Sequence, residues 1–235
     1  MECLYVPALE VGQVFVELTD PDELRHVRVL RLRQGERVAL TNGRGCLVVG
    51  ELLQYSKAPP RALFRVVELL EPPEFPVRLG LAIGLLHDRE RLEFAVEKAV
   101  ELGVQEIVLL QTCYTQPCEV RLERLRAKVL AAVKQAHRAW MPSIRGPMGL
   151  VECCDSVFPA YRQWVVAEVS GGEPAPLRSS PTLVLVGPEG GWSVEELQIL
   201  QRARAALWSL GRQRLRAETA AVVALGLVRF LLRQS

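Results

Sequence analysis

The segment VGPEGGWSVEEL, residues 186–197, joins an apolar run to a helix start through three glycines, a proline and a glutamate. Ser193 and Glu196 have the spacing of a capping box, which marks the first turn of the helix. Glycines let a ligand approach backbone N–H and C=O groups at the carboxyl end of a parallel strand. The alternative is a tight connection whose glycines only supply positive φ angles. The loop is neither G-x-G-x-x-G nor a P-loop, which argues against a dinucleotide or a nucleoside triphosphate.

A second glycine-containing loop lies in SLGRQRLRAETAA, residues 209–221. Arg212, Arg214 and Arg216 fall within five residues, just before a terminal helix. A solvated basic turn is the alternative, because arginines are common on protein surfaces. Since both loops follow strands of one predicted sheet, we expect them to form a single pocket.

A dense group of arginines lies in LRHVRVLRLRQGER, residues 24–37. Its members, called the arginine patch below, are Arg25, Arg28, Arg31, Arg33 and Arg37. Glu36 is the only acid among them, and such a density of positive charge predicts a face that contacts phosphates. The alternative is a solvated face balanced by the nearby Asp20, Asp22 and Glu23.

The elements that must position these residues divide at EPPEFP, residues 71–76, where three prolines in six residues suit neither a helix nor a central strand. We therefore predict one domain at 1–72 and a second at 73–235. Short apolar runs separated by turn residues predict a small antiparallel barrel or sheet in the first. Buried strands that alternate with amphipathic segments predict an α/β domain with a mostly parallel sheet in the second. The predicted strands of the second domain are 77–86, 106–112, 163–169, 182–188 and 205–211.

Three helices are predicted in the second domain. One begins after Asp88, which can cap it, and ends at Gly103, where a left-handed residue is wanted. Another covers residues 122–136, with Arg and Lys on its polar face. The terminal helix, residues 219–232, is apolar nearly all round and must be buried on more than one side. It is either a central helix of the domain or an oligomer interface, and its place at the chain terminus favours the interface.

The composition is that of a packed protein, with 235 residues, 49% of them hydrophobic, and a net charge of +2. No stretch is long and apolar enough to span a bilayer, and the N-terminus lacks the pattern of a signal peptide, so we expect a cytoplasmic protein without membrane contact. The six cysteines contain no C-x-x-C pair, and the three scattered histidines complete no usual zinc set. We therefore predict free thiols and no metal site, and we assign no catalytic function to the histidines.

Five segments in this order and spacing resemble the RsmE family of 16S rRNA uracil-N3 methyltransferases, which belongs to the SPOUT class. The segments are HVRVLRLRQGE, RERLEFAVEKAVELGV, KQAHRAWMP, LVLVGPEGG and SLGRQRLRAETAA. The resemblance covers nearly the whole chain, and the pairing of GPEGG with L-R-x-E-T-A is its most specific part. It implies a PUA-like barrel at 1–72, an α/β domain at 73–235 with a trefoil knot that binds S-adenosylmethionine, and a homodimer. It also implies 16S rRNA as partner, within the small ribosomal subunit.

The resemblance assigns residues to each expected function. The implied cofactor-binding residues are Leu185, Gly187, Pro188, Glu189, Gly190, Gly191, Leu210, Gly211, Leu215, Thr219 and Ala220. The implied RNA-binding residues are Arg28, Arg31, Arg33, Arg91, Lys98 and Arg138, the last contributed to the second subunit if the terminal helices pair. Arg216 and Glu218 are the implied catalytic residues.

The chain departs from the family pattern at Cys3 and Arg91, and Gln213 and Arg214 stand where Arg and an apolar residue are usual. Cofactor binding survives such changes more easily than RNA affinity, because no glycine is altered. Two alternatives therefore stay open, a SPOUT methyltransferase for another rRNA or tRNA position and an RNA-binding assembly factor without catalysis.

The expected chemistry is a displacement at the methyl of a sulfonium by N3 of uracil, which must lose its proton. Such a reaction needs in-line positioning and stabilisation of negative charge on the uracil oxygens. The guanidinium of Arg216 suits the second task. Solvent and Glu218 are both open as the proton acceptor, and no metal is required because the sulfur is already positive.

Overall fold

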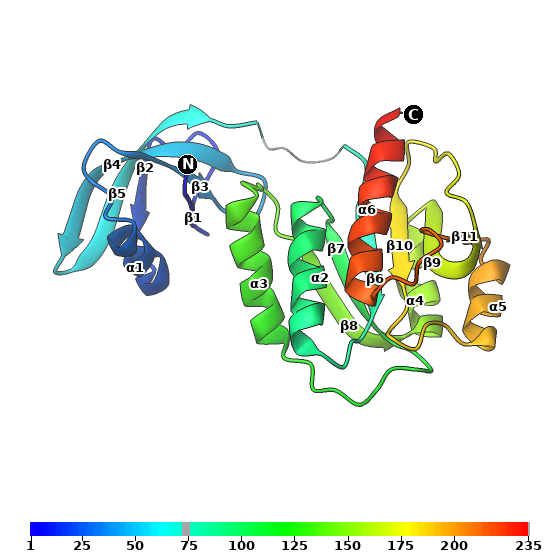
Figure 1. The fold of residues 1–235 in the computed structure, drawn as a ribbon. Helices are drawn as coiled ribbons and strands as arrows, with labels where there is room; N and C mark the ends of the chain where they lie inside the picture. The colour runs from blue at the N-terminus through cyan, green and yellow to red at the C-terminus, as the bar shows by residue number, and fades with distance from the viewer. Residues whose placement is uncertain (72–75, 235) are drawn as a thin grey trace. The chain divides into compact units, whose positions relative to one another are not determined.

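The computed structural model describes residues 1–71 and 76–234 (Figure 1). The chain forms two compact units, one of Met1–Glu74 with Leu130–Met141, the other of Phe75–Val129 with Pro142–Ser235. The boundary predicted at 71–76 has its centre in residues 72–75, which lie outside the described residues, so the division into 1–72 and 73–235 stays a prediction. The sequence division places residues 130–141 with the second domain, whereas the compact units group them with the first.

The first unit contains a five-stranded sheet in the order β1-β3-β4-β5-β2. Its strands are β1 (Cys3–Tyr5), β2 (Phe15–Leu18), β3 (Arg37–Thr41), β4 (Leu47–Lys57) and β5 (Pro60–Leu69). The pairs β3·β4, β4·β5 and β5·β2 are antiparallel, as the turn-separated apolar runs predict, but β1 pairs parallel to β3. Leu4, Leu40 and Phe64 of this sheet are fully buried in one core. Strand β1 has only three residues, and it is held in place by the burial of Leu4 and by its pairing with β3.

Helix α1 (Pro21–Val29) carries part of the arginine patch. The sequence analysis predicted the patch but no helix at this position. Asp20 caps its N-terminus by accepting the backbone N–H groups of Asp22 and Glu23. At the other end Arg31 has a φ of 54°, and the N–H of Leu32 returns to the carbonyl of Val27. All five arginines of the patch are exposed, four on this helix and the turn after it and Arg37 at the start of β3.

The second unit contains a six-stranded parallel sheet in the order β11-β9-β10-β6-β7-β8. Its strands are β6 (Leu79–Gly84), β7 (Glu106–Gln111), β8 (Ser143–Gly149), β9 (Gln163–Gly172), β10 (Thr182–Val186) and β11 (Ala206–Trp208). The predicted α/β class with a parallel sheet and a small β domain is confirmed. Strand β8 was missed because its sequence SIRGPMG has neither an apolar run nor strict alternation.

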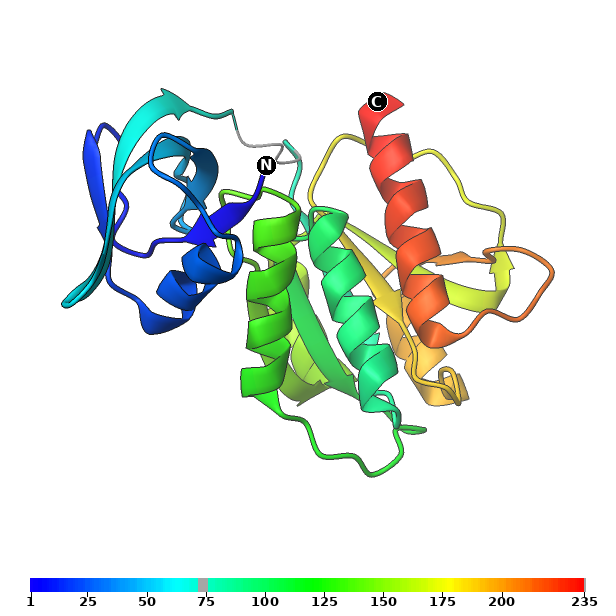
Figure 2. The same ribbon diagram turned by 60° about the vertical axis from the view of Figure 1, so that its left-hand side comes forward.

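Helices cover both faces of this sheet. They are α2 (Arg89–Glu101), α3 (Leu122–Gln135), α4 (Leu150–Ser156), α5 (Val194–Arg202) and α6 (Ala217–Gln234), with a 3-10 turn at Phe158–Ala160. Helices α2 and α6 lie side by side on one face (Figures 1 and 2). On the other face, Leu183 and Leu185 of β10 share a core with Cys153 of α4 and Leu200 of α5. Asp88 caps α2 and Gly103 follows it with a φ of 89°, both as predicted.

The terminal helix α6 packs within its own domain against β6, β9, β10 and α2. Ala221, Ala224, Leu225 and Val228 are fully buried there. The helix is therefore covered on one side by the chain itself, which is the central-helix alternative, while the homodimer and the trefoil knot stay predictions.

The six cysteines are free thiols. Within residues 1–71 and 76–234, no helix combines the length and the apolar character needed to cross a membrane.

The end of α5 gives a prediction about stability. Arg204 has a φ of 60°, and the N–H of Ala205 returns to the carbonyl of Leu200, as in a Schellman motif. Since glycine adopts this conformation without the Cβ cost, we expect Arg204→Gly to raise the free energy of unfolding by about 0.5 to 1 kcal/mol. The control Arg202→Gly, at the last residue of α5, should instead lower it, by at most about 1 kcal/mol. Urea unfolding measures both, and a destabilised Arg204→Gly protein would contradict the prediction.

Candidate active site

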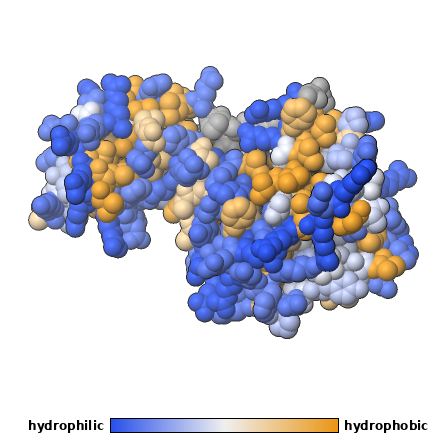
Figure 3. Space-filling model, viewed as in Figure 1, coloured by the Kyte–Doolittle hydropathy of each residue, from blue (hydrophilic) through white to orange (hydrophobic). Residues whose placement is uncertain are grey.

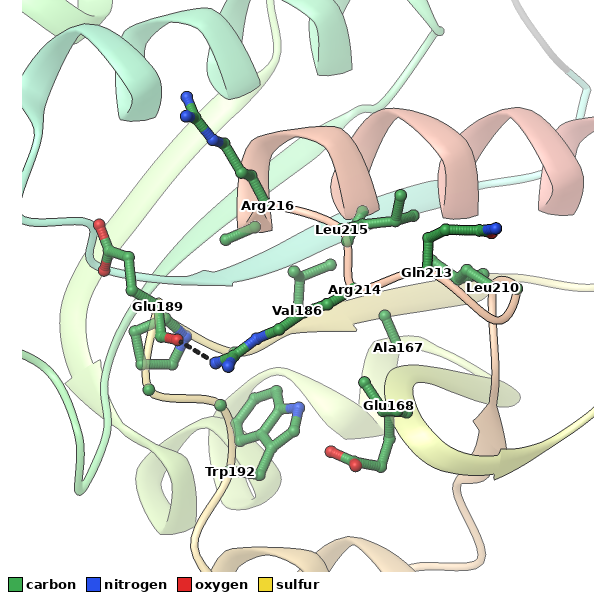
Figure 4. Close-up of a pocket in the computed structure, with 18 of the residues that line it drawn as sticks. Ala167, Glu168, Val186, Glu189, Trp192, Leu210, Gln213, Arg214, Leu215 and Arg216 are labelled. Atoms are coloured by element: carbon green, nitrogen blue, oxygen red, sulfur yellow. Dashed lines mark hydrogen bonds between the residues drawn. The ribbon is translucent and has the colours of Figure 1, made fainter.

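A cavity of about 660 Å³ opens at the carboxyl ends of β9, β10 and β11 (Figure 4). Its lining consists of residues 167–169, 186–192 and 210–217, together with Arg91 and Ala220. Residues 186–192 leave β10 and residues 210–217 follow β11, whereas residues 167–169 lie within β9 where its pairing with β10 ends. Ligand sites of parallel sheets form at this edge. The volume lies in the usual range for small-molecule sites, about 300 to 1,000 Å³. The prediction that the two glycine loops form one pocket is therefore confirmed by their shared lining.

Close packing of main chain against main chain shapes the first loop. A Cβ on Gly84 would lie 2.4 Å from the backbone nitrogen of Pro188, and one on Gly187 would lie 3.1 Å from the carbonyl carbon of Gly191. Gly191 itself has a φ of 75°, a region that favours glycine. These glycines let β6 and the loop fold tightly, so that backbone atoms form one wall of the cavity.

Gly190 was expected to leave space for a ligand, but its missing side chain leaves space for Tyr114. A Cβ at this position would lie 2.6 Å from the Cβ of Tyr114. Tyr114 stands in the loop after β7, which is held by a hydrogen bond of 2.8 Å from the N–H of Cys113 to the carboxylate of Glu196. Glu196 also completes the predicted capping box with Ser193. Glu196, in the first turn of α5, thus holds the loop after β7 against the glycine loop.

The Glu189 carboxylate is directed to the start of α2. Its Oε1 accepts the N–H of His87 at 3.1 Å and an N–H of Arg91 at 3.5 Å. The Glu189 carbonyl oxygen accepts a hydrogen bond of 3.2 Å from Arg214. Glu189 was expected to contact the cofactor, but its side chain is already bound to protein groups.

Arg91 and Glu218 form a two-point ion pair at the edge of the cavity. The Nε of Arg91 donates to Oε1 at 2.9 Å, and its Nη2 donates to Oε2 at 2.7 Å. Burial raises the pKa of the Glu218 carboxyl, but hydrogen bonds and charge from Arg91 outweigh it and hold the pKa below its ordinary value. The hydrogen bonds to Glu218 likewise raise the pKa of Arg91.

This pair revises two sequence expectations. A carboxylate with a lowered pKa and both oxygens occupied is a poor proton acceptor, which argues against that function for Glu218. The guanidinium of Arg91 is held by Glu218 and Glu189, so it is not presented to RNA as a free phosphate contact. Arg216, in contrast, is exposed, and its guanidinium has no hydrogen bond or ion pair to any residue that the structure describes, although its backbone carbonyl accepts the N–H of Ala220. Its side chain points away from Trp192 and Glu168 (Figure 4).

The other expected cofactor residues divide into two groups. Those in the cavity lining are Gly187, Pro188, Gly190, Gly191, Leu210, Gly211, Leu215 and Ala220. Leu185 and Thr219 are outside it. Leu185 faces the core shared with α4 and α5, because side chains alternate along β10, and Thr219 is exposed on the first turn of α6.

The expected RNA contacts also divide. Arg28, Arg31 and Arg33 are exposed in the first unit. Lys98 is bound to Glu97 at 2.9 Å and to Glu101 at 2.7 Å, so its charge is balanced within α2. Arg138 is only 3% exposed, which removes it as a surface contact in this chain.

Several lining residues were missed from sequence. Ala167, Glu168 and Val169 lie within β9 where its pairing with β10 ends, and Trp192 follows the first glycine loop. The strand at 163–169 was predicted, but the order of strands, which places β9 beside β10, is set by long-range pairing. Among the described residues, no group of three or more His, Cys, Asp or Glu side chains could hold a metal ion.

The chain matches the family described as an RNA methyltransferase domain over residues 73–229, and the RNA methyltransferase PUA domain over residues 18–57. It is 30% identical over 226 residues to the ribosomal RNA small subunit methyltransferase E of Rickettsia conorii, covering 92% of this chain and 90% of that protein. This chain belongs to the ribosomal RNA small subunit methyltransferase E family. The Mycobacterium tuberculosis member is 33% identical over 228 residues, covering 91% of this chain and 86% of its own.

Solved structures of family members and related proteins share the fold. The Neisseria gonorrhoeae ribosomal RNA small subunit methyltransferase E, bound to S-adenosyl methionine, superposes with a TM-score of 0.86 at 28% identity, covering 98% of both chains. A putative methyltransferase from Legionella pneumophila, in complex with the same cofactor, gives a TM-score of 0.83 at 27% identity, covering 97% of this chain and 96% of the other. The family resemblance inferred from the five segments is confirmed.

The Arg91–Glu218 pair gives a prediction about pH. Because the folded pKa of Glu218 lies below its ordinary value of 4.5, the pair stabilises the protein above that pH. This contribution is lost as the pH falls through the lowered folded pKa. Glu218→Gln should therefore lower the free energy of unfolding by about 1 to 3 kcal/mol near pH 7, and the deficit should shrink towards pH 3.

Urea unfolding of wild type and Glu218→Gln across this pH range measures the effect. The control is Glu173→Gln, since Glu173 is exposed and has no ion pair within the described residues. A deficit that is constant with pH would mean that Glu218 stabilises the fold by packing and not by its charge.

Proposed function

We propose that this chain transfers the methyl group of S-adenosylmethionine to N3 of a uridine in the 16S rRNA of the small ribosomal subunit. The observation that carries the proposal is the cavity built by β9 and the loops after β10 and β11 in a chain of this family. The Neisseria gonorrhoeae and Legionella pneumophila structures contain the same cofactor and share the fold of this chain. The uridine and its N3 atom are the finer part of the proposal.

The cavity fits the cofactor by its walls. Backbone atoms of the first loop form one wall, because Gly187 and Gly190 allow the close packing of this loop and Gly191 has open space where a Cβ would stand. Gly211 opens the second loop with a φ of 133°. Leu210, Leu215 and the ring of Trp192 supply apolar surface. When bound, the cofactor supplies a methyl group activated by the positive sulfur.

Arg216 is the group that suits the charge developing on uracil. It lines the cavity and is exposed, and its guanidinium has no hydrogen bond or ion pair among the residues that the structure describes. Its N–H groups are therefore available to donate to the uracil oxygens as the N3 proton leaves. We assign that proton to solvent, because both oxygens of Glu218 hold Arg91. Glu218 then acts by fixing Arg91 and the first turn of α6.

The arginine patch supplies the proposed RNA contact of the first unit. Its five arginines are exposed on α1, the following turn and the first residue of β3. The Schellman turn at Arg31 fixes the backbone of that residue, so its side chain leaves the surface from a defined point. Phosphate contacts of this kind position RNA without reading its sequence.

The homodimer is proposed on an apolar surface of the second unit. Phe94 of α2 and Phe230 of α6 are 45% and 58% exposed, on two helices that pack together. Figure 3 shows apolar side chains gathered over α6. A second copy of this chain would cover that surface. Phe230→Asp would place a charge on this surface. If the surface is a dimer interface, sedimentation should show a dimer for the wild type and a monomer for this variant.

Methyl transfer to small ribosomal subunits tests the function. Subunits lacking this modification are incubated with the protein and methyl-labelled cofactor, and the RNA is digested and analysed by mass spectrometry against standards. We expect N3-methyluridine from one position in 16S rRNA. Label in another nucleoside, or in tRNA, would assign a different target, and RNA binding without any label would favour an assembly factor.

Arg216→Ala separates catalysis from binding. A guanidinium that interacts more strongly with the transition state than with the ground state contributes to kcat. We expect a loss of about 100-fold to 1,000-fold in the single-turnover rate at saturating RNA and cofactor, with cofactor affinity little changed. The matched control is Arg212→Ala, from the same loop. Normal turnover of Arg216→Ala at saturating RNA would make Arg216 only an RNA contact.

Arg31→Gly tests the arginine patch with its own control. Arg31 and Arg204 both occupy left-handed positions at helix ends, so glycine relieves the backbone at each. Only Arg31→Gly should weaken RNA binding, with the slope of log affinity against log salt reduced by about one. Fluorescence anisotropy over a salt series measures the slope. Equal RNA affinity of the two variants would remove Arg31 from the interface.

A further inference from the structure

Two oppositely charged side chains from different loops enter the same cavity (Figure 4). Glu168 lies in β9, one residue past the last pair of β9 with β10, and Arg214 lies in the loop before α6. No ion pair joins them, and neither was assigned a function from the sequence. Both side chains line the cavity without contacting each other.

Glu168 presents one oxygen to the cavity. Its Oε1 accepts both the N–H and the hydroxyl of Ser170, each at 3.1 Å, which fixes the carboxylate. Its Oε2 has no hydrogen bond or ion pair to any described residue. The side chain is partly buried, so a bound donor would meet it in a partly desolvated place. The position suits a cationic N–H donor.

Arg214 presents donors to the same space. Its side chain extends across the cavity and donates a hydrogen bond of 3.2 Å to the carbonyl oxygen of Glu189 (Figure 4). Within the described residues this is the one hydrogen bond of the Arg214 side chain. A guanidinium has five N–H groups, so most of them stay available for a ligand. Arg91 in the same lining is different, because Glu218 and Glu189 already hold it.

The charges of the lining explain why the two side chains are needed together. The charged residues of the lining are Arg91, Arg212, Arg214, Arg216, Glu168 and Glu189. Four arginines against two glutamates disfavour a cationic ligand, and the Glu189 carboxylate is directed to Arg91 and His87. Glu168 is therefore the one lining carboxylate that can offset a positive group of the ligand.

We propose that Glu168 and Arg214 bind the amino-acid end of the cofactor, Glu168 at its ammonium group and Arg214 at its carboxylate. This inference rests on the proposed function. A guanidinium matches a carboxylate with two parallel hydrogen bonds, and an ammonium group donates to a carboxylate oxygen. The indole of Trp192, 7% exposed, lies in the wall between Arg214 and Glu168 (Figure 4).

Calorimetry with four ligands tests each contact separately. S-adenosylmethionine and S-adenosylhomocysteine carry both charged groups, decarboxylated S-adenosylmethionine carries the amine alone, and methylthioadenosine carries neither. Arg214→Met should weaken binding of the first two by about 10-fold to 100-fold and leave the other two unchanged. Glu168→Gln should weaken all three ligands that carry the amine by a similar factor and leave methylthioadenosine unchanged.

Arg212→Met and Glu173→Gln are the matched controls, one in the same loop as Arg214 and one beyond the end of β9. Loss of methylthioadenosine binding in either test variant, or the same ligand pattern in a control, would overturn the assignment. So would unchanged affinity of Arg214→Met for S-adenosylmethionine. Failure of the wild type to bind S-adenosylmethionine would instead overturn the proposed function, so the two failures are distinguishable.

Discussion

The close approach of main-chain segments around residues 187–191 is the constraint on which the rest of the site depends. Gly84 allows β6 to touch Pro188, and Gly187 allows the loop to fold against Gly191. Gly190 allows the Tyr114 loop to pack from outside. Because the loop is fixed on these sides, its remaining backbone surface faces the ends of β9 and β11 and forms a cavity. A larger residue at any of these positions would move the wall of the site.

The charged groups around this cavity fall into a closed set and an open set. In the closed set, Arg91 is held by Glu218 and Glu189, which ties α2 to the first turn of α6 and to the glycine loop. In the open set, Glu168, Arg214 and Arg216 keep hydrogen-bonding capacity toward the cavity or its edge. The closed set stabilises the framework, and the open set supplies the proposed contacts to cofactor and uracil. This division accounts for a site rich in arginine that still binds a sulfonium.

Local patterns predicted much of this structure, and non-local pairing explains what they missed. The caps at Asp88 and Ser193 and the two glycine loops were readable because each depends on neighbouring residues. Strand β8 lacked a periodic signal, and β1 is a strand only because it pairs with β3. Glu168 joined the site through strand order, and Glu218 lost its expected function through pairing with Arg91, 127 residues away. Neither contact leaves a trace in local sequence.

Hydrogen–deuterium exchange with and without S-adenosylmethionine tests whether three segments at one edge of the parallel sheet form the cofactor site. We expect slower exchange in residues 167–169, 186–192 and 210–217, with residues 1–71 unchanged. Unchanged exchange in these three segments at saturating cofactor, or protection confined to other parts of the chain, would contradict it.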